Sequence, residues 1–148
     1  MKVTASAYKH FRKYGSWPTA PQEKSPDALY VFHITPVAKP RMTRGDKANY
    51  RPVTQRYWKY VNRLKEMAKS QGYVPGNPLS IRFCVPIPKS WSKKKREAAE
   101  GSPCMKRPDL DNYIKAFKDA LLEEDSHIWQ YTKMEKVYSM TPRIEVLS

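Results

Sequence analysis

Apolar positions recur along the chain in two patterns, one typical of strands and one typical of helices. Residues 28–34 are rich in β-branched and aromatic side chains and predict a first strand, and residues 79–85 predict a second, which two prolines stop. Between them, residues 54–71 carry an apolar stripe at helical spacing, with Thr54 to cap the helix and Gly72 to end it. The first half of the chain therefore predicts strand, helix, strand.

The second half begins with two helices of different length. Residues 92–101 predict a short helix, with Ser92 as its N-cap and Gly101 as its stop. Asp109 or Asp111 opens a longer helix. The positions that recur on the buried face of this longer helix are Leu110, Ile114, Phe117 and Leu121.

Two more strands complete the predicted elements, one at roughly residues 128–138 and one at residues 143–147. In the last strand, Ile144 and Val146 alternate with charged residues, as in a strand with two different faces. The predicted order is β-α-β-(short α)-α-β-β. This order predicts an α+β fold in which helices pack on one face of a single mixed β-sheet.

The chain divides into a basic arm and one domain. Residues 1–28 are polar, basic and interrupted by prolines, which predicts an N-terminal arm with at most a short helix at residues 6–14. Residues 29–148 form the predicted domain, and 148 residues suffice to bury one core. Within this domain, residues 36–52 form a long basic loop, and loops of this length are usually functional or mobile.

The charge of the chain indicates what kind of partner it has. A formal net charge of +14 and a pI near 9.8 favour a polyanion, nucleic acid before an anionic membrane surface. No apolar run approaches the roughly 18 residues of a membrane span, so we expect a cytoplasmic protein with no membrane partner. Cys84 and Cys104 lack zinc-like spacing and are expected to be reduced thiols.

Acidic residues gather in one segment of this basic chain. Residues 108–125 hold six of the 14 acids and two lysines, which gives the segment a net charge of −4 and the other 130 residues +18. Asp109, Asp111 and Asp125 supply the hard carboxylate oxygens that Mg²⁺ or Mn²⁺ prefers. Such a cation keeps positions open for water and phosphate oxygens, as phosphodiester hydrolysis requires. Lys115, four residues after Asp111, would orient water or neutralise phosphate charge.

A structural role for the same acids is the main alternative. An Asp-x-Asp-Asn sequence before a helix is typical of capping, and Asp111, Lys115 and Asp119 are spaced as a surface ion-pair ladder. Spacing alone favours capping, whereas the gathering of acids in a +18 background, directly after Lys106 and Arg107, favours a metal and phosphate site. A dehalogenase-type Asp-x-Asp would follow an apolar strand, and none precedes it here. A glycosyltransferase-type Asp-x-Asp would leave the basic charge unexplained.

Basic clusters outside the acidic run are the candidate DNA contacts. They lie in the loop after the first strand, at the start of the short helix and just before the acids: Lys39, Arg41, Arg44, Lys93, Lys94, Lys95 and Arg107. The helix dipole disfavours lysines at a helix start, and a bound phosphate would relieve this cost, but a solvated run of charges fits the sequence equally well. The helix at 54–71 carries a further basic stripe of Arg56, Lys59 and Arg63, which fits either a DNA contact or a solvated face.

The acidic segment also carries a resemblance to a known family. The run Arg-Pro-Asp-Leu-Asp-Asn-Tyr-Ile-Lys-Ala-Phe-Lys-Asp-Ala-Leu at 107–121 is followed by Glu-Asp-Ser-His-Ile at 124–128. Together they resemble the signature of RusA-type Holliday-junction resolvases, in the form found in phages and prophages. Residues 86–96 and 36–42 are similar to the segments that precede this signature and follow the first strand in the family. The resemblance covers roughly residues 29–147.

The resemblance implies a fold, an activity and a site. Members of the family are homodimers that cut four-way junctions with Mg²⁺ or Mn²⁺. Their metal-binding aspartates match Asp109, Asp111 and Asp125, and their catalytic lysine matches Lys115. The spacer before the last acids is shorter than in many members, and Glu124 stands where the family tends to have Asp. Asp125 and Glu124 therefore both remain candidates for the third ligand.

Two functional hypotheses follow. The first is a metal-dependent, structure-selective endonuclease that resolves Holliday junctions and other branched DNA by paired phosphodiester hydrolysis. The second is a non-catalytic basic DNA-binding protein whose acids cap helices. The first requires a dimer, and the sequence offers Trp129 and Tyr131, or the edge of the strand at 143–147, as interface; either is equally compatible with core or a covered edge.

Overall fold

The computed structural model describes residues 24–41 and 52–148 and contains one four-stranded mixed sheet. The strands lie in the order β1-β4-β2-β3. Their bounds are Ala28–Phe32 for β1, Leu79–Pro86 for β2, Tyr131–Ser139 for β3 and Arg143–Leu147 for β4. β4 pairs antiparallel with both β1 and β2, and β3 runs parallel to β2.

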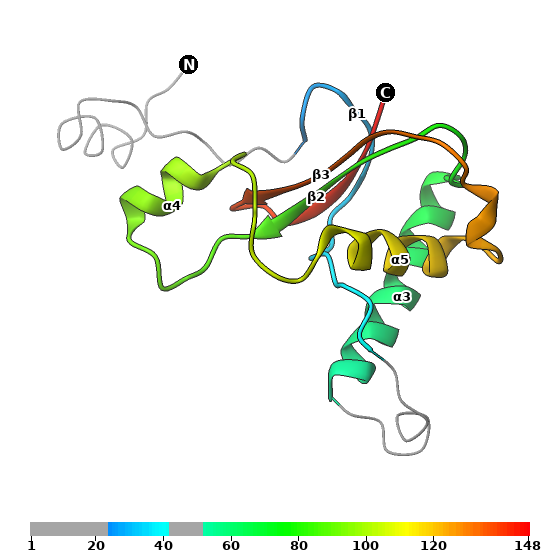
Figure 1. The fold of residues 1–148 in the computed structure, drawn as a ribbon, viewed down its shortest axis with the longest axis horizontal. Helices are drawn as coiled ribbons and strands as arrows, with labels where there is room; N and C mark the ends of the chain where they lie inside the picture. Colours follow the sequence, from blue (N-terminus) through cyan, green and yellow to red (C-terminus); the bar gives the residue numbers. More distant parts are fainter. Residues whose placement is uncertain (1–23, 42–51) are drawn as a thin grey trace.

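Helices α3 (Pro52–Gln71) and α5 (Leu110–Leu121) cover one face of the sheet, and the short helix α4 (Lys93–Ala99) stands away from them at the other end of the molecule (Figure 1). The Phe117 ring of α5 lies 6.5 Å from Phe32 of β1 and 6.4 Å from Phe83 of β2, centroid to centroid. The core therefore sits between the two long helices and the sheet. The predicted α+β fold, with its element order and single mixed sheet, is confirmed.

The predicted ends of the helices are mostly confirmed. The Ser92 hydroxyl accepts a hydrogen bond from the Lys95 backbone N–H at 3.3 Å, and Gly101, with a φ of +77°, follows the end of α4. Gly72 ends α3 with a φ of +65°, a conformation that favours glycine. Thr54, however, is buried inside α3 and does not cap it, because the helix begins at Pro52 and proline is favoured in a first turn.

Two predicted strand ends are wrong, and local hydrogen bonds explain both. β1 stops at Phe32 because the Ile34 N–H turns back to the Phe32 carbonyl at 2.8 Å. β3 starts at Tyr131 because the segment before it bonds to a side chain. The Asn77 amide donates to the His127 carbonyl at 2.7 Å and accepts from the Trp129 N–H at 2.8 Å. Residues 125–127 form a short 3-10 helix, η1 (Asp125–His127).

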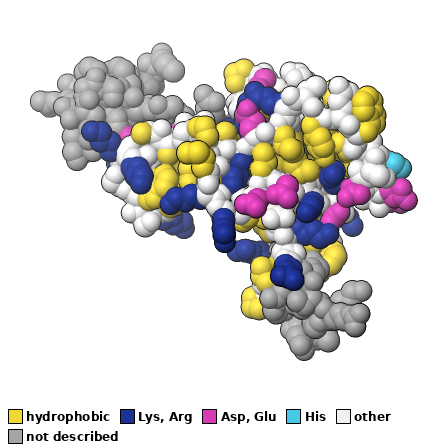
Figure 2. All heavy atoms as spheres, in the orientation of Figure 1, with side chains coloured by type: hydrophobic (Ala, Val, Ile, Leu, Met, Phe, Trp, Pro, Cys, Tyr) yellow, Lys and Arg dark blue, Asp and Glu magenta, His cyan; other side chains and the backbone are white. Residues whose placement is uncertain are grey.

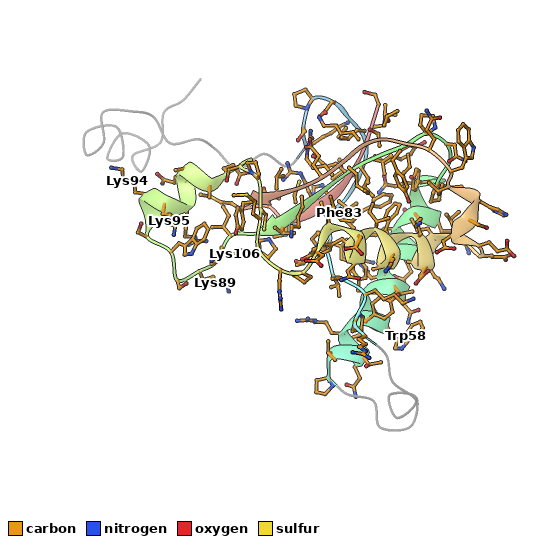
Figure 3. All side chains as sticks on the ribbon, viewed as in Figure 1. Trp58, Phe83, Lys89, Lys94, Lys95 and Lys106 are labelled. Atoms are coloured by element: carbon orange, nitrogen blue, oxygen red, sulfur yellow. The ribbon has the colours of Figure 1, made fainter. Side chains whose placement is uncertain are left out.

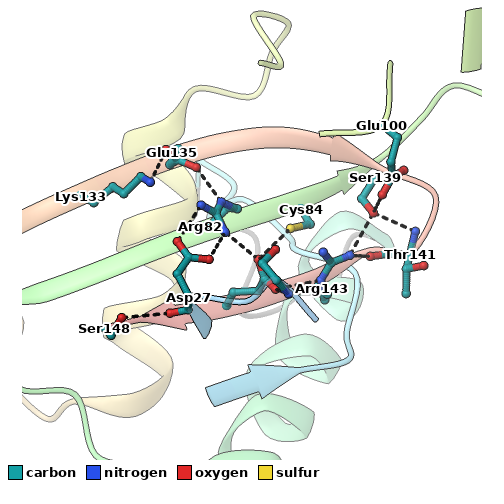
Figure 4. A network of polar contacts seen from close by, with 12 residues as sticks. Asp27, Arg82, Cys84, Glu100, Lys133, Glu135, Ser139, Thr141, Arg143 and Ser148 are labelled. Atoms are coloured by element: carbon teal, nitrogen blue, oxygen red, sulfur yellow. Dashed lines mark hydrogen bonds and ion pairs between the residues drawn. The ribbon is translucent and has the colours of Figure 1, made fainter. Parts of the chain in front are cut away.

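The second face of the sheet carries a buried network of charges (Figure 4). Glu145 of β4 is fully buried and accepts hydrogen bonds from Arg82 at 3.1 Å and from Arg143 at 3.2 Å. Burial raises the pKa of the neighbouring Cys84 thiol to about 12, and Cys84 and Cys104 are both free. The charged residues that alternate along the last strand are thus buried, and this strand lies inside the sheet, so the suggested pairing through its edge is wrong.

The last residues of the predicted N-terminal arm contact this network. The Ser25 backbone N–H and hydroxyl donate to Glu145 at 2.7 and 2.8 Å, and Asp27 pairs with Arg82 at 3.1 Å. Residues 1–23, including the short helix suggested at 6–14, lie outside the described residues. In the described ranges, no helix combines the length and apolarity needed to cross a membrane.

Candidate active site

The start of α5 presents two carboxylates. Asp109 is the N-cap residue, with an extended backbone at φ −68° and ψ 149°, yet its side chain makes no capping hydrogen bond. Asp111 lies in the first turn, where the helix dipole favours negative charge. Both side chains are exposed. The capping hypothesis requires a hydrogen bond between the Asp109 carboxylate and the helix end, and this bond is not made.

The segment before Asp109 is fastened to the sheet by a residue that the sequence did not reveal. The Lys136 ammonium of β3 donates to the Lys106 carbonyl at 2.5 Å and to the Pro108 carbonyl at 2.6 Å. These bonds fix the chain on both sides of Arg107, which is exposed. Nothing in the sequence around Lys136 distinguishes it from the other lysines, because its role depends on a long-range contact.

Lys115 lies one helical turn after Asp111. Its ammonium is 3.8 Å from the Asp111 carboxylate, and the two side chains are 57% and 66% exposed. An exposed pair of this kind contributes less than about 1 kcal/mol to stability. Lys115 is therefore only weakly held and is free to move to a phosphate. The suggested ladder does not continue to Asp119, which pairs with Lys39 instead.

Lys115 and Asp125 line one hollow of about 480 Å³ beside α5. Asn112, Lys115 and Asp119 share this side of the helix because they are three and four residues apart. The turn at η1 returns the chain so that Asp125 joins them. Glu124 instead lies 3.8 Å from His127, with both side chains exposed. Of the two acids, Asp125 and not Glu124 is among the residues that line the hollow with Lys115.

The basic loop after β1 forms the opposite side of the hollow. The Lys39 backbone N–H donates to the Asn112 carbonyl at 3.0 Å, and the Lys39 ammonium pairs with Asp119. Arg41 lines the same hollow. Arg44 falls outside the described residues. Two of the three cations predicted for this loop are thus placed beside Lys115.

The lysines of α4 form a separate basic cluster around Trp91. Lys93, Lys94 and Lys95 are exposed, and the Lys95 ammonium lies 4.1 Å from the centre of the Trp91 ring. Lys106 approaches the same ring at 5.5 Å, and Figure 3 shows it between α4 and the start of α5. Figure 2 shows Lys and Arg side chains along the face from α4 to α3, with acidic side chains among them over α5.

The predicted metal ligands are not gathered into one cluster. Within residues 24–41 and 52–148, no three His, Cys, Asp or Glu side chains are placed to hold a metal ion. Asp109 and Asp111 stand at the start of α5, whereas Asp125 follows its end. The structure therefore brings Asp125 to Lys115 but does not bring all three carboxylates together.

Comparison with known proteins identifies the family to which this chain belongs. A family model described as endodeoxyribonuclease RusA matches residues 32–147. The chain is 38% identical over 134 residues to the uncharacterized protein YqaN of Bacillus subtilis strain 168, a match that covers 80% of this chain and 92% of that protein. No solved structure matches significantly. The match indicates an endonuclease of the type that acts on Holliday junctions. The chain belongs to the RusA family of endodeoxyribonucleases, as its resemblance predicted.

Proposed function

We propose that the chain is a structure-selective endonuclease, dependent on Mg²⁺ or Mn²⁺, that resolves Holliday junctions and other branched DNA. It would act as a homodimer through paired phosphodiester hydrolysis. The observation that carries this proposal is the arrangement along α5. Two exposed carboxylates open the helix, and Lys115 and Asp125 then line one hollow with the basic loop at Lys39 and Arg41.

The carboxylates at the start of α5 fit a hard divalent cation. Magnesium is usually bound through one or two carboxylates together with waters and substrate phosphates, and does not need a complete cage of protein ligands. Asp109 and Asp111 would hold the cation. Asp125, which the structure places beside Lys115 and does not gather into one cluster with those two aspartates, is proposed as the third carboxylate. A bound cation supplies an electrophile for a phosphate oxygen and lowers the pKa of water.

The other residues of the site would position the DNA and stabilise charge. Lys39 and Arg41 would hold backbone phosphates beside α5, and contacts of this kind fix register without reading sequence. Lys115 would donate to a non-bridging oxygen of the scissile phosphate, where negative charge grows in the transition state. Arg107, two residues before the N-cap of α5, and the lysines of α4 would hold the adjoining DNA, since all of them are exposed.

The alternative, a non-catalytic DNA-binding protein, requires the acids to act as caps. Asp109 occupies the capping position, yet its side chain accepts no hydrogen bond from the helix. Capping of α5 also assigns no role to Asp125, which lies beyond the end of that helix and lines one hollow with Lys115. These two observations favour the nuclease.

Cleavage of a synthetic four-way junction tests the proposal. The protein should cut the junction in Mg²⁺, leave it intact in EDTA and leave a linear duplex of the same sequence uncut. Asp111→Asn keeps the side-chain size but removes the charge that attracts a cation, so cutting should fall by about 100-fold or more while junction binding persists. Glu66→Gln, which changes an exposed acid of α3, is the control and should cut normally. Near-normal cutting by Asp111→Asn would contradict the site assignment.

A further inference from the structure

A second hollow, larger than the first, lies beside the candidate active site. It has a volume of about 730 Å³ and is bounded by residues 34–40, by α3 and by the start of α5. Figure 1 shows the segment after β1 running from near the start of α5 along the first part of α3. The volume falls within the roughly 300–1,000 Å³ of typical ligand pockets. We call it the α3 groove.

The charge of the α3 groove is of one sign. Lys39, Arg56, Lys59 and Arg63 line it, and no Asp or Glu is among the described residues that do so. Arg56, Lys59 and Arg63 are exposed and recur every three to four residues, so they project from one side of α3. For this basic stripe the sequence allowed either a DNA contact or a solvated face. In the structure the stripe forms the charged side of a groove.

The remaining lining of the α3 groove is largely apolar. It includes Ile34, Val37, Val53, Tyr60 and Tyr113. A groove with cations on one side and apolar and aromatic side chains on the other suits a single nucleic acid strand. The strand's phosphates meet the cations, and its sugars and bases meet the apolar surface. A B-form duplex is far too wide to enter a hollow of this volume.

The α3 groove is continuous with the candidate active site. Lys39 and Asn112 line both the groove and the hollow that holds Lys115 and Asp125. A strand whose phosphate lies at Lys115 therefore has a basic path that continues along α3. A strand on this path does not have to pass the acids of the site, because these acids lie on the α5 side.

We propose that the α3 groove binds an unpaired stretch of the DNA strand next to the scissile phosphate. This inference rests on the proposed nuclease function and explains its selectivity for branched DNA. Strands leave the duplex stack at a branch point, so a stretch can enter the groove there and cannot do so within a continuous duplex. The groove residues thus position the strand, and the cutting groups lie outside it.

A pair of double variants tests this proposal. Arg56→Ala with Lys59→Ala removes two charges from the groove side of α3. Lys65→Ala with Lys69→Ala removes two charges from the same helix at a different hollow, where Asp119 and Glu123 also lie. Arg63 is left unchanged because it already pairs with Glu66 at 3.3 Å. Circular dichroism checks that both variants fold, which is expected because all four side chains are exposed.

Binding is measured in EDTA with an oligothymidine strand, a linear duplex and a four-way junction as probes. The groove variant should bind oligothymidine and the junction at least about 10-fold more weakly than the control variant. Its slope of log affinity against log salt should be lower by about 0.7 for each phosphate that the groove no longer holds. The two variants should bind the duplex equally.

Equal losses of oligothymidine binding in both variants would contradict strand binding in the groove. The charges would then act only through the overall electrostatic potential of the protein. Failure of the nuclease function gives a different result. If the unchanged protein cut no junction in Mg²⁺ while the groove variant alone lost oligothymidine binding, the groove would stand as a strand-binding site without the nuclease.

Discussion

Lys115 is the residue on which the chemistry of the proposed function most depends. If its ammonium stabilises charge at the scissile phosphate, Lys115→Ala should lower the cutting rate at saturating junction by about 100-fold, as loss of one transition-state donor does elsewhere. Affinity should change little, because the side chain is exposed and makes one weak ion pair. Single-turnover cleavage and a binding titration separate the two effects.

Lys118→Ala is the matched control for Lys115, because Lys118 lies on the same helix but faces the Tyr131 ring at 5.7 Å. This control variant should cut at close to the normal rate. A Lys115→Ala protein that also turned over normally would remove Lys115 from the mechanism and return it to a surface ion pair.

Glu145 is the residue on which we expect stability to depend. It is fully buried between Arg82 and Arg143, and the latter is only 3% exposed. Glu145→Ala would leave buried positive charge without its partner, which typically costs about 3–5 kcal/mol in the free energy of unfolding. Glu66→Ala breaks an exposed pair with Arg63 and should cost less than about 1 kcal/mol. Urea unfolding of the two variants measures the difference, and equal small losses would contradict a stabilising role for Glu145.

The same residue predicts how stability depends on pH. Burial alone would raise the pKa of Glu145, but hydrogen bonds from Ser25, Arg82 and Arg143 outweigh it and lower the pKa below its ordinary 4.5. A lowered pKa in the folded state stabilises the fold above pH 4.5, and this contribution is lost as the pH falls through the folded-state pKa. The unfolding free energy of Glu145→Gln should therefore fall less steeply below pH 4.5 than that of the unchanged protein. Parallel curves would exclude Glu145 as a source of the acid sensitivity.

At the scale of elements, periodicity and caps predicted every α-helix and strand among the described residues, but not the 3-10 helix η1. Long-range contacts decided the features that these local signals did not predict. The α4 boundaries followed from Ser92 and Gly101, which are local signals. The start of β3 could not be predicted from local sequence, because the segment before this strand is held by the side chain of Asn77, which lies 50 residues before His127. Likewise, the acids and Lys115 were visible in one run of sequence. The groove side of α3 was not, because only the fold places it beside α5.

The basic cluster of α4 is an element with its own test. Lys93, Lys94 and Lys95 are exposed, and Figure 3 shows Lys94 and Lys95 at the far end of the molecule from α3. If all three lysines touch duplex phosphates, replacing them together by Ala should flatten the slope of log affinity against log salt by up to about 3 × 0.9. An unchanged slope on a four-way junction would make α4 a solvated helix.

At the scale of the whole molecule, one chain carries one set of site residues, whereas resolution of a junction requires two cuts. A two-fold dimer would match the symmetry of an unfolded junction and place two sites on opposite arms. Trp129 remains a candidate for the interface because its side chain is 76% exposed, whereas Tyr131 is partly buried against the core. Light scattering should give about twice the 17.3 kDa chain mass. The phage or prophage origin and the cytoplasmic location also stay predictions.

A supercoiled plasmid with an extruded cruciform tests the proposed nuclease most directly, since it reports metal dependence, branch selectivity and paired cutting together. We expect the protein to convert this plasmid to linear DNA in Mg²⁺, to leave it supercoiled in EDTA, and not to linearise a plasmid without the inverted repeat. Cutting that is independent of the cruciform, or the absence of any metal-dependent cutting, would contradict the proposed function. Accumulation of nicked circles alone would contradict the paired cuts of a dimer.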